Sequence, residues 1–335
     1  MKYLATILVV ICLVSCEKEE VKFHVLQGEA FGTIYTIQFF SSEEFEVQKG
    51  IDSVIYGVNR SVSTYMPNSD ISKVNRGDST LVIDSIFKDV FRISEAVHKK
   101  SNGYFDPTIG VLRNAYGFGD IKALNKIDEK VLDSLMQFVG FDKVSITKNG
   151  TIKKENPNIY FDFNAVAKGY GIDCLGRYLE ANKVKNYLIE LGGEIRAKGK
   201  NISKKKPWIA GIESIHSELE DRNYDAKIRL ENKSMASSGN YRKFRTDSLT
   251  GKKYVHTINP LTGSAEQSDI TSASVVAETC AIADAYATTI MALGFEKAKV
   301  LLKDKLEIEA YFTYSDSLHT EQVYMTDGFR RLLVE

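Results

Sequence analysis

An unusually apolar helix near the C-terminus places the strongest limit on how this chain can fold. Residues 277–294 (AETCAIADAYATTIMALG) are apolar nearly all round, so the helix that they predict should be buried. Asp284 and Thr288 lie on one face of this helix, one turn apart. A carboxylate inside such a helix is unfavourable unless it is paired or bound to a metal ion. Asp284 is therefore the best single functional candidate in the chain.

A second stretch with concentrated polar chemistry is residues 161–173 (FDFNAVAKGYGID). The apolar residues 159–161 predict a short buried strand, and Asn164 is a plausible N-cap of a helix that continues to Tyr178. The free N–H groups at such a helix start would suit a phosphate. The two glycines of the stretch could equally be packing devices.

Periodicity predicts the remaining elements. The segment 103–119, rich in glycine and aromatic residues, is expected to be irregular, either lining a flat aromatic ligand or packing on the core. We expect helices over 47–58, 86–97 and 132–139, two strands within 23–40 that turn near Gly28, a hairpin over 144–153, and strands over 187–190, 208–212, 254–258, 270–276, 309–314 and 322–325.

Histidine and cysteine usage leaves two alternatives open. His256, in the predicted strand 254–258, is either a satisfied structural histidine or a catalytic one. Cys174 and Cys280 lie in apolar helical segments and are expected to be buried free thiols, although an exported protein could pair them. The sequence has no CxxC motif and no histidine-rich metal site.

Length and charge limit the class of protein. A chain of 335 residues with an ordinary apolar share can bury a full core as one large domain or two closely packed ones. Basic and acidic residues number 44 each, so no overall positive field favours nucleic acid as a partner. Disordered and fibrous classes are excluded.

The N-terminus has the composition of a secretory signal. Lys2 precedes an apolar run over 3–14, and Cys16 is followed by the charged residues 17–20. Residues 13–16 (LVSC) resemble the bacterial lipobox, in which the cysteine becomes a lipid-modified, typically palmitoylated, N-terminus. We therefore expect a signal peptide over 1–15, a tether over 16–22 and one domain over 23–335, on a membrane-anchored lipoprotein facing the periplasm or cell exterior. The alternative is an ordinary cleaved signal with an incidental cysteine.

Eight segments in order carry a family resemblance that covers nearly the whole mature chain. They are 31-FGTIYTI-37, 63-STYMPNSDIS-72, 105-FDPTIG-110, 162-DFNAVAKGYGID-173, 189-IELGGE-194, 236-ASSGNYR-242, 256-HTINPLTG-263 and 283-ADAYAT-288. With the lipobox, this pattern resembles the FAD:protein FMN transferase family of ApbE-type lipoproteins. The fold that the resemblance implies is α+β, with mixed sheets, packed helices and a flavin cleft between two halves.

The resemblance also implies an activity and a set of site residues. Such an enzyme binds FAD with Mg²⁺, cleaves the pyrophosphate and places FMN on a threonine of another exported protein, while AMP leaves. The implied metal ligands are Asp284, Thr288 and the carbonyl of Ala165. The implied FAD contacts are Phe31, Tyr65, Tyr116, Gly117, Phe118, Asp162, Lys168 and the region of His256. The family often has Met at Phe31, Trp at Tyr116 and Asp at Asn259, so the flavin contacts depart more than the metal ligands do.

The chemistry of these residues agrees with phosphoryl transfer. Carboxylate, hydroxyl and carbonyl oxygens are ligands for magnesium rather than zinc. The attacking threonine must lose a proton, and either His256 or Asp284 could accept it. Two rival functions use the same pocket: a periplasmic FAD pyrophosphatase that gives FMN and AMP, and a non-enzymatic lipoprotein that carries FAD.

Overall fold

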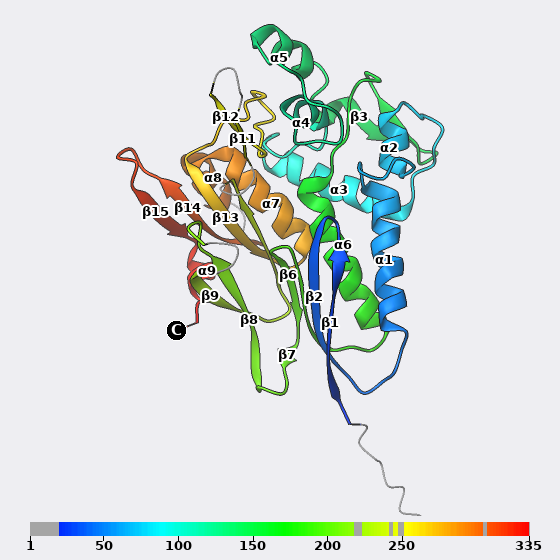
Figure 1. Cartoon of the computed structure of the whole chain (residues 1–335), viewed down its shortest axis with the longest axis vertical. Helices are drawn as coiled ribbons and strands as arrows, with labels where there is room; N and C mark the ends of the chain where they lie inside the picture. The colour runs from blue at the N-terminus through cyan, green and yellow to red at the C-terminus, as the bar shows by residue number, and fades with distance from the viewer. Residues whose placement is uncertain (1–19, 218–222, 241–243, 247–250, 304–306, 335) are drawn as a thin grey trace, which may run out of the picture.

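The computed structural model describes residues 20–217, 223–240, 244–246, 251–303 and 307–334 (Figure 1). Its framework is a sheet of eight strands in the order β1-β2-β5-β6-β10-β13-β14-β15, and every neighbouring pair is antiparallel. The strands are β1 (Lys22–Ala30), β2 (Thr33–Ser41), β5 (Asn186–Leu191), β6 (Glu194–Lys198), β10 (Ser234–Gly239), β13 (Ile270–Ala277), β14 (Glu309–Ser315) and β15 (Glu321–Met325). The expected α+β fold class is confirmed.

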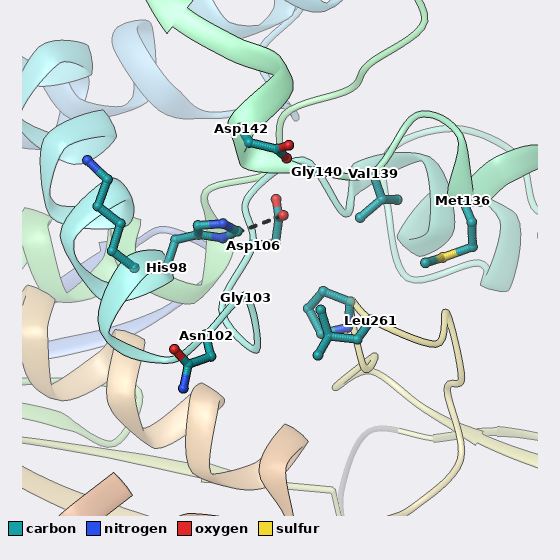
Figure 2. A pocket seen from close by; sticks show the side chains of 11 residues that line it. His98, Asn102, Gly103, Asp106, Met136, Val139, Gly140, Asp142 and Leu261 are labelled. Atoms are coloured by element: carbon teal, nitrogen blue, oxygen red, sulfur yellow. Dashed lines mark ion pairs between the residues drawn. The ribbon is translucent and has the colours of Figure 1, made fainter. Parts of the chain in front are cut away.

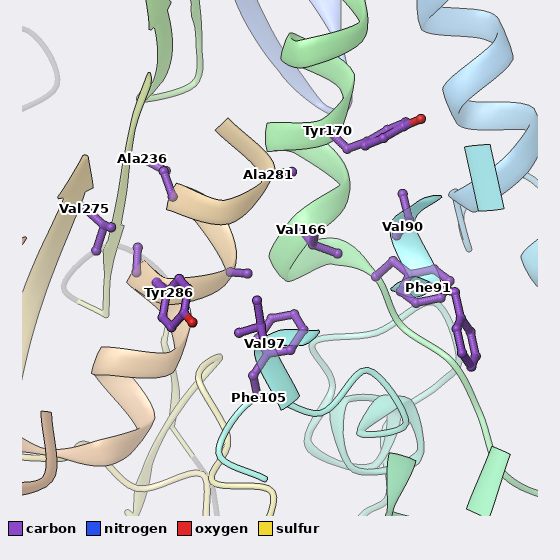
Figure 3. Close-up of a cluster of buried hydrophobic side chains, with 14 of the residues drawn as sticks. Val90, Phe91, Val97, Phe105, Val166, Tyr170, Ala236, Val275, Ala281 and Tyr286 are labelled. Carbon is purple, nitrogen blue, oxygen red and sulfur yellow. The ribbon is translucent and has the colours of Figure 1, made fainter. Parts of the chain in front are cut away.

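Helices cover one face of this sheet. α7 (Cys280–Leu293) packs on β10 and β13, and α6 (Asn164–Ala181) packs beside it. α1 (Val47–Val62), α3 (Ser85–Lys100) and α8 (Phe295–Lys303) complete the layer. Figure 3 shows the core between them, where Val166 of α6 and Tyr286 of α7 face Val97 of α3. Because α7 lies between the sheet and other helices, it needs an apolar surface on nearly every side.

A small sheet covers part of the opposite face. It contains β7 (Lys200–Asn201), β8 (Lys206–Glu213) and β9 (Tyr224–Leu230), with α9 (Asp327–Arg330) nearby. Trp208 of β8 and Leu230 of β9 share a buried cluster with Leu188 and Met235 of the main sheet. The main sheet is therefore buried on both faces over its central strands.

The remaining short elements surround the upper end of α6 in Figure 1. They are α2 (Asp70–Asn75), α4 (Gly110–Tyr116), α5 (Glu129–Met136), a 3-10 turn (Phe141–Lys143), β3 (Val144–Ile146), β4 (Ile152–Lys154), β11 (Phe244–Thr246) and β12 (Lys253–Val255). Within the described ranges, no helix is long and apolar enough to cross a membrane.

Four local predictions are wrong. The first hairpin turns at Phe31 and Gly32, both with positive φ, while Gly28 pairs with Tyr35 in the ladder. A Cβ on Gly28 would lie 2.5 Å from the Tyr35 hydroxyl, so this glycine makes room for a tyrosine instead of forming a turn. Residues 159–161 form no strand and contribute only an isolated bridge between Tyr160 and Ile109.

The third wrong prediction concerns the segment 103–119, which contains the helix α4. Gly117 ends this helix with a left-handed φ of 82°, the usual role of a glycine just beyond a helix. Asn164 is also the first residue of α6 rather than its N-cap. Its amide donates to Asp162 Oδ1 at 2.8 Å, so the aspartate two residues earlier satisfies this helix start.

Candidate functional site

A cavity of about 1190 Å³ opens at the upper ends of the central strands and the start of α6. Its volume exceeds the roughly 300–1,000 Å³ of ordinary small-molecule pockets. The cavity is lined by residues from many parts of the chain, including Phe31, Tyr65, Phe118, Asp162, Ala165, Lys168, His256, Asp284 and Thr288. Nine of the residues predicted for the site thus line one cavity.

Asp284 is one of the deeply buried acidic groups that line the cavity. It is 4% exposed, and its Oδ2 accepts a hydrogen bond from the Gly169 amide at 3.1 Å. Burial and the nearby charge of Glu194 raise the pKa of Asp284 to about 7, against the opposing effect of Lys168. A bound cation would stabilise the ionised form of this buried carboxylate.

Lys168 and Glu194 form an ion pair next to Asp284. Burial lowers the pKa of Lys168, but the charges of Glu194 and Asp284 outweigh it and raise the pKa overall. Glu194 is buried at the start of β6, directly after the turn at Gly192 and Gly193. Glu194 was not among the predicted site residues, although it ends the segment 189–194; its position after a glycine pair was the available signal.

The donor set around Asp284 fits a magnesium ion. In a regular α-helix the Gly169 amide faces the carbonyl of Ala165, so the Asp284 carboxylate and that carbonyl approach the same amide. Thr288 lies one turn along α7, with its Oγ1 3.5 Å from Ser238 Oγ. Within the described residues, no three acidic, histidine or cysteine side chains form a metal cage, so neutral oxygens must supply part of the coordination, as magnesium accepts.

The two glycines of the stretch 161–173 are packing devices. A Cβ on Gly169 would lie 2.4 Å from the Cys280 carbonyl oxygen, and one on Gly171 would lie 2.6 Å from the Phe31 ring. The first glycine lets α6 approach the start of α7, which brings Lys168 and Asp284 together. The second lets Phe31 lie against α6 while it lines the cavity.

Asp162 lies at the centre of a second polar group. It accepts from the amide and side chain of Asn164 and pairs with Arg113 Nη1 at 2.9 Å. Arg113 also donates to the carbonyl of Phe118 at 2.8 Å. This arginine of α4, which the sequence analysis missed, therefore joins the α6 start to the turn at Phe118.

The predicted aromatic contacts fall into two groups. Tyr65 is 61% exposed at the cavity, and Phe118 lines it with its ring centroid 6.5 Å from that of His256. Tyr116 does not line the cavity, and neither does Gly117. The Tyr116 hydroxyl donates to the carbonyl of Gly263 at 3.0 Å, its ring packs on Tyr254, and burial raises its pKa to about 12. The structure thus places Tyr116 in the core.

His256 follows β12 directly and is half-buried at the cavity. It reaches the cavity from a segment remote in sequence from α6 and α7. The expected strand over 254–258 is shorter than predicted, because β12 ends at Val255. Its position beyond the strand end leaves the imidazole facing the same space as Lys168 and Asp284.

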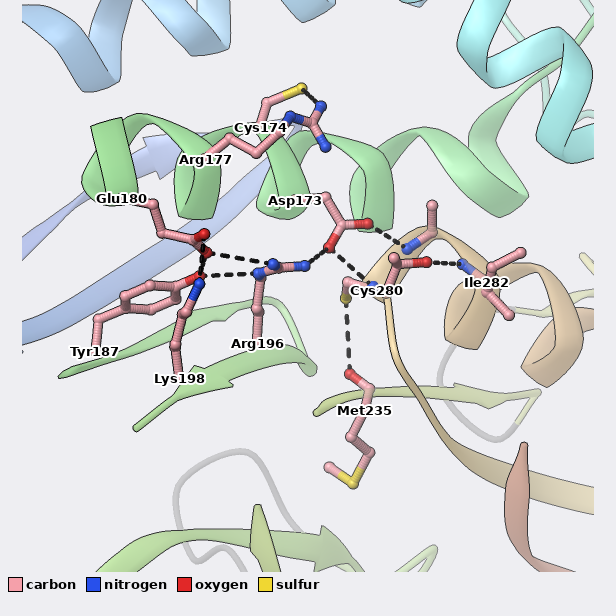
Figure 4. Close-up of polar contacts among 12 residues, drawn as sticks. Asp173, Cys174, Arg177, Glu180, Tyr187, Arg196, Lys198, Met235, Cys280 and Ile282 are labelled. Atoms are coloured by element: carbon pink, nitrogen blue, oxygen red, sulfur yellow. Dashed lines mark hydrogen bonds and ion pairs between the residues drawn. The ribbon is translucent and has the colours of Figure 1, made fainter. Parts of the chain in front are cut away.

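A network of buried charges fixes α7 against α6 (Figure 4). Asp173 of α6 accepts hydrogen bonds from the amides of Cys280 and Ala281 at 3.0 and 2.9 Å. Arg196 of β6 donates to the same carboxylate at 2.6 Å. Asp173 therefore satisfies orphan N–H groups at the start of α7 and sets the helix that carries Asp284. Cys174 and Cys280 are free thiols, as expected.

A second, smaller hollow of about 500 Å³ is shown in Figure 2 and shares Asp106 and Pro260 with the first. His98 Nδ1 lies 2.8 Å from the carbonyl oxygen of Phe105 and 3.6 Å from Asp106 Oδ2. Asp106 also accepts from the Thr108 hydroxyl and from the Phe141 amide. These contacts fasten the 105–110 segment to α3, which is a structural role.

Comparisons with known proteins agree with one another. Residues 31–312 match the family described as the ApbE family. A protein named FAD:protein FMN transferase from Haemophilus influenzae is 34% identical, over 88% of each chain. Its namesake from Escherichia coli K12 is 27% identical, over 92% of this chain and 89% of the other. The solved structure of the flavin transferase ApbE from Vibrio cholerae superimposes with a TM-score of 0.82 at 27% identity, over 94% of this chain and all of that one.

Proposed function

This chain belongs to the ApbE family, and we propose that, as an FAD:protein FMN transferase, it uses Mg²⁺ to move the FMN half of FAD onto a threonine of an exported protein. The observation that carries the proposal is that Asp284, Lys168 and His256 line the same cavity. Its size suits a ligand larger than an ordinary cofactor fragment together with part of a second substrate.

The reaction is a displacement at phosphorus. The threonine Oγ forms a bond to the phosphorus of the FMN half, while the bond from that phosphorus to the bridging oxygen breaks. AMP leaves with the electron pair of the broken bond, and the hydroxyl proton passes to a base. Such a transfer depends mainly on positioning and on neutralising phosphate charge.

Asp284, the Thr288 hydroxyl and the Ala165 carbonyl would hold the magnesium ion. When bound, the ion supplies positive charge to the pyrophosphate oxygens. Lys168 adds a second positive charge in the same cavity, and its ion pair with Glu194 fixes the ammonium group. Glu194 thereby positions Lys168, while Asp162 and Arg113 position the turn that carries Phe118.

His256 is the better candidate for the base. A carboxylate that ligates a cation is poorly available for a proton, which removes Asp284 from that role. His256 lines the same cavity from the segment that follows β12. An imidazole side chain is suited to accepting a proton near neutral pH.

We also propose that the enzyme works outside the cytoplasm. Cys16 lies outside the described residues, so this proposal rests on the lipobox-like residues 13–16 and the apolar run before them. A lipid on Cys16 would place the cavity among exported proteins, in the periplasm or at the cell exterior.

The test supplies FAD, Mg²⁺ and an exported flavoprotein domain, and measures the mass of that domain. We expect an increase of one FMN on a threonine, release of AMP, and loss of both signals with a chelator. Replacing the acceptor threonine by alanine should abolish the mass increase. If free FMN and AMP are released at the same rate with and without every acceptor tried, the result favours the pyrophosphatase alternative. FAD binding without AMP release would favour a carrier.

A further inference from the structure

We propose that the acceptor segment docks in the cavity as an added antiparallel strand along the open edge of β10, with its threonine opposite Ser238. This inference rests on the proposed transfer to a protein. Its starting point is a break in the main sheet: β10 pairs with β6 only through Ser234 with Arg196 and Met235 with Ile195. On its other side β10 pairs with β13 along its whole length.

The break has a clear cause. β6 begins at Glu194 because Gly192 and Gly193, with φ of 60° and 107°, reverse the chain where β5 ends. The next pair in register, Glu194 with Ala236, is no longer formed, so the strands diverge. A Cβ on Gly193 would have no atom within 4 Å other than those of Gly193 and its two chain neighbours, which indicates open space beside this turn.

Two hydrogen bonds show which backbone N–H and C=O groups of β10 face each neighbouring strand. The Ala197 amide donates to the Lys233 carbonyl at 2.9 Å, so odd-numbered residues direct their backbone groups toward β6. The Asn240 amide donates to the Thr271 carbonyl, so even-numbered residues face β13. The N–H and C=O groups of Ser237 and Gly239 therefore point to the open edge. Within the described residues, no strand pairs with that edge.

This edge lies in the cavity and next to the proposed metal ligands. Ser237, Ser238 and Gly239 all line the cavity, and Ser237 is exposed. Ser238 directs its side chain toward α7, where its Oγ is 3.5 Å from Thr288 Oγ1. A residue opposite Ser238 in an added strand would direct its side chain to the same side.

The chemistry of the edge selects a polypeptide. An unpaired strand edge offers N–H and C=O groups over several residues, and another extended backbone matches this repeat along its length. The small side chains of Ser237, Ser238 and Gly239 leave room for that backbone. We take the antiparallel direction because the added strand continues the position of β6, which is antiparallel to β10.

The first test is a scan of N-methylated peptides. The probe is a synthetic peptide copied from around the threonine that becomes modified in the transfer assay. In antiparallel pairing, the residues on either side of that threonine bond to Ser237 and Gly239, whereas the threonine amide points away. N-methylation of either neighbour should raise the peptide KM about tenfold, the effect of losing roughly one hydrogen bond, and N-methylation of the threonine should change it little. A flat profile, or one dominated by the threonine amide, overturns the proposal.

The second test uses the intact acceptor protein and two enzyme variants. Ser237→Pro removes the edge-facing N–H, a change that strands tolerate where the N–H is not part of a ladder. Ser237→Ala is the matched control, because it keeps the amide. We expect KM for the acceptor to rise about tenfold for Ser237→Pro only. Equal KM values, or a loss of FAD affinity confined to Ser237→Pro, would overturn docking of the acceptor at this edge. Wild-type transfer in the same assay separates either result from failure of the transferase function itself.

Discussion

The Asp284 side chain provides the first test at the scale of single residues. Replacing it by alanine removes the charge that would hold Mg²⁺, whereas Thr288→Val removes only a neutral ligand. We expect Asp284→Ala to abolish magnesium-dependent AMP release and Thr288→Val to reduce it by a smaller factor, measured at saturating FAD. Wild-type AMP release from folded Asp284→Ala protein would contradict the metal assignment.

The pH dependence of stability follows from the same carboxylate. Its pKa of about 7 in the folded protein lies above the roughly 3.9 of an unfolded aspartate. The folded state therefore binds this proton more tightly, and its stabilising effect is lost as pH rises toward 7. In chelator, the unfolding free energy of the wild type should fall by about 2 kcal/mol more than that of Asp284→Asn between about pH 5 and 7, measured by urea denaturation. Parallel curves for the two proteins would contradict this.

Tyr65 and Tyr116, both predicted to contact FAD, should respond differently to substitution. Tyr65 is exposed at the cavity, so Tyr65→Ala should weaken FAD binding by roughly tenfold, as expected for one lost aromatic contact. Tyr116 donates to the Gly263 carbonyl in the core, so Tyr116→Phe should lower the unfolding free energy by about 1 kcal/mol and leave FAD affinity unchanged. Titration of flavin fluorescence and urea denaturation distinguish the two effects.

At the scale of secondary structure elements, Asp173 connects α6, α7 and β6. Removing its carboxylate leaves Arg196 buried without this partner and two amides of α7 without an acceptor. We expect Asp173→Ala to lower the unfolding free energy by about 3–5 kcal/mol. Lys198→Ala removes a more exposed ion pair to Glu180 and should lower it by less than about 1 kcal/mol. Similar losses for the two variants would contradict the anchoring role.

The elements that local sequence predicts well are those with a strong hydrophobic pattern. The buried positions of α7 and Asp284 follow from one segment alone, because a nearly uniform apolar surface has few alternatives. The strand expected over 159–161 fails since burial of an apolar run does not require a ladder. The turn near Gly28 fails because its glycine accommodates a side chain across the hairpin.

Only part of the site could be predicted from the sequence, because several of its contacts join residues far apart in the chain. Spacing within α7 relates Asp284 to Thr288, but the contacts of Lys168 with Glu194 and of Arg113 with Asp162 join residues far apart in the chain. Their pairing depends on how the sheet and helices pack. Tyr116 and Phe118 are two residues apart, yet only Phe118 lines the cavity, because α4 ends at Gly117 between them.

At the scale of the whole molecule, the anchor can be tested directly. If Cys16 carries lipid, the wild type should be found with membranes, whereas Cys16→Ser should lose processing and lipid and be recovered largely without them. Cell fractionation and mass measurement of the mature N-terminus provide the readout. Unchanged processing and membrane recovery of Cys16→Ser would contradict the anchor.

The position of β1 sets how far such an anchored enzyme can reach. β1 runs for nine residues from Lys22 to Ala30, so Phe31, which follows β1 and lines the cavity, lies about 30 Å along the strand from its start. Residues 16–22 can add at most about 20 Å. The enzyme would therefore search a layer about 50 Å deep above the lipid, the sum of these two spans. A target that holds its threonine farther out would escape modification, however well its sequence matched.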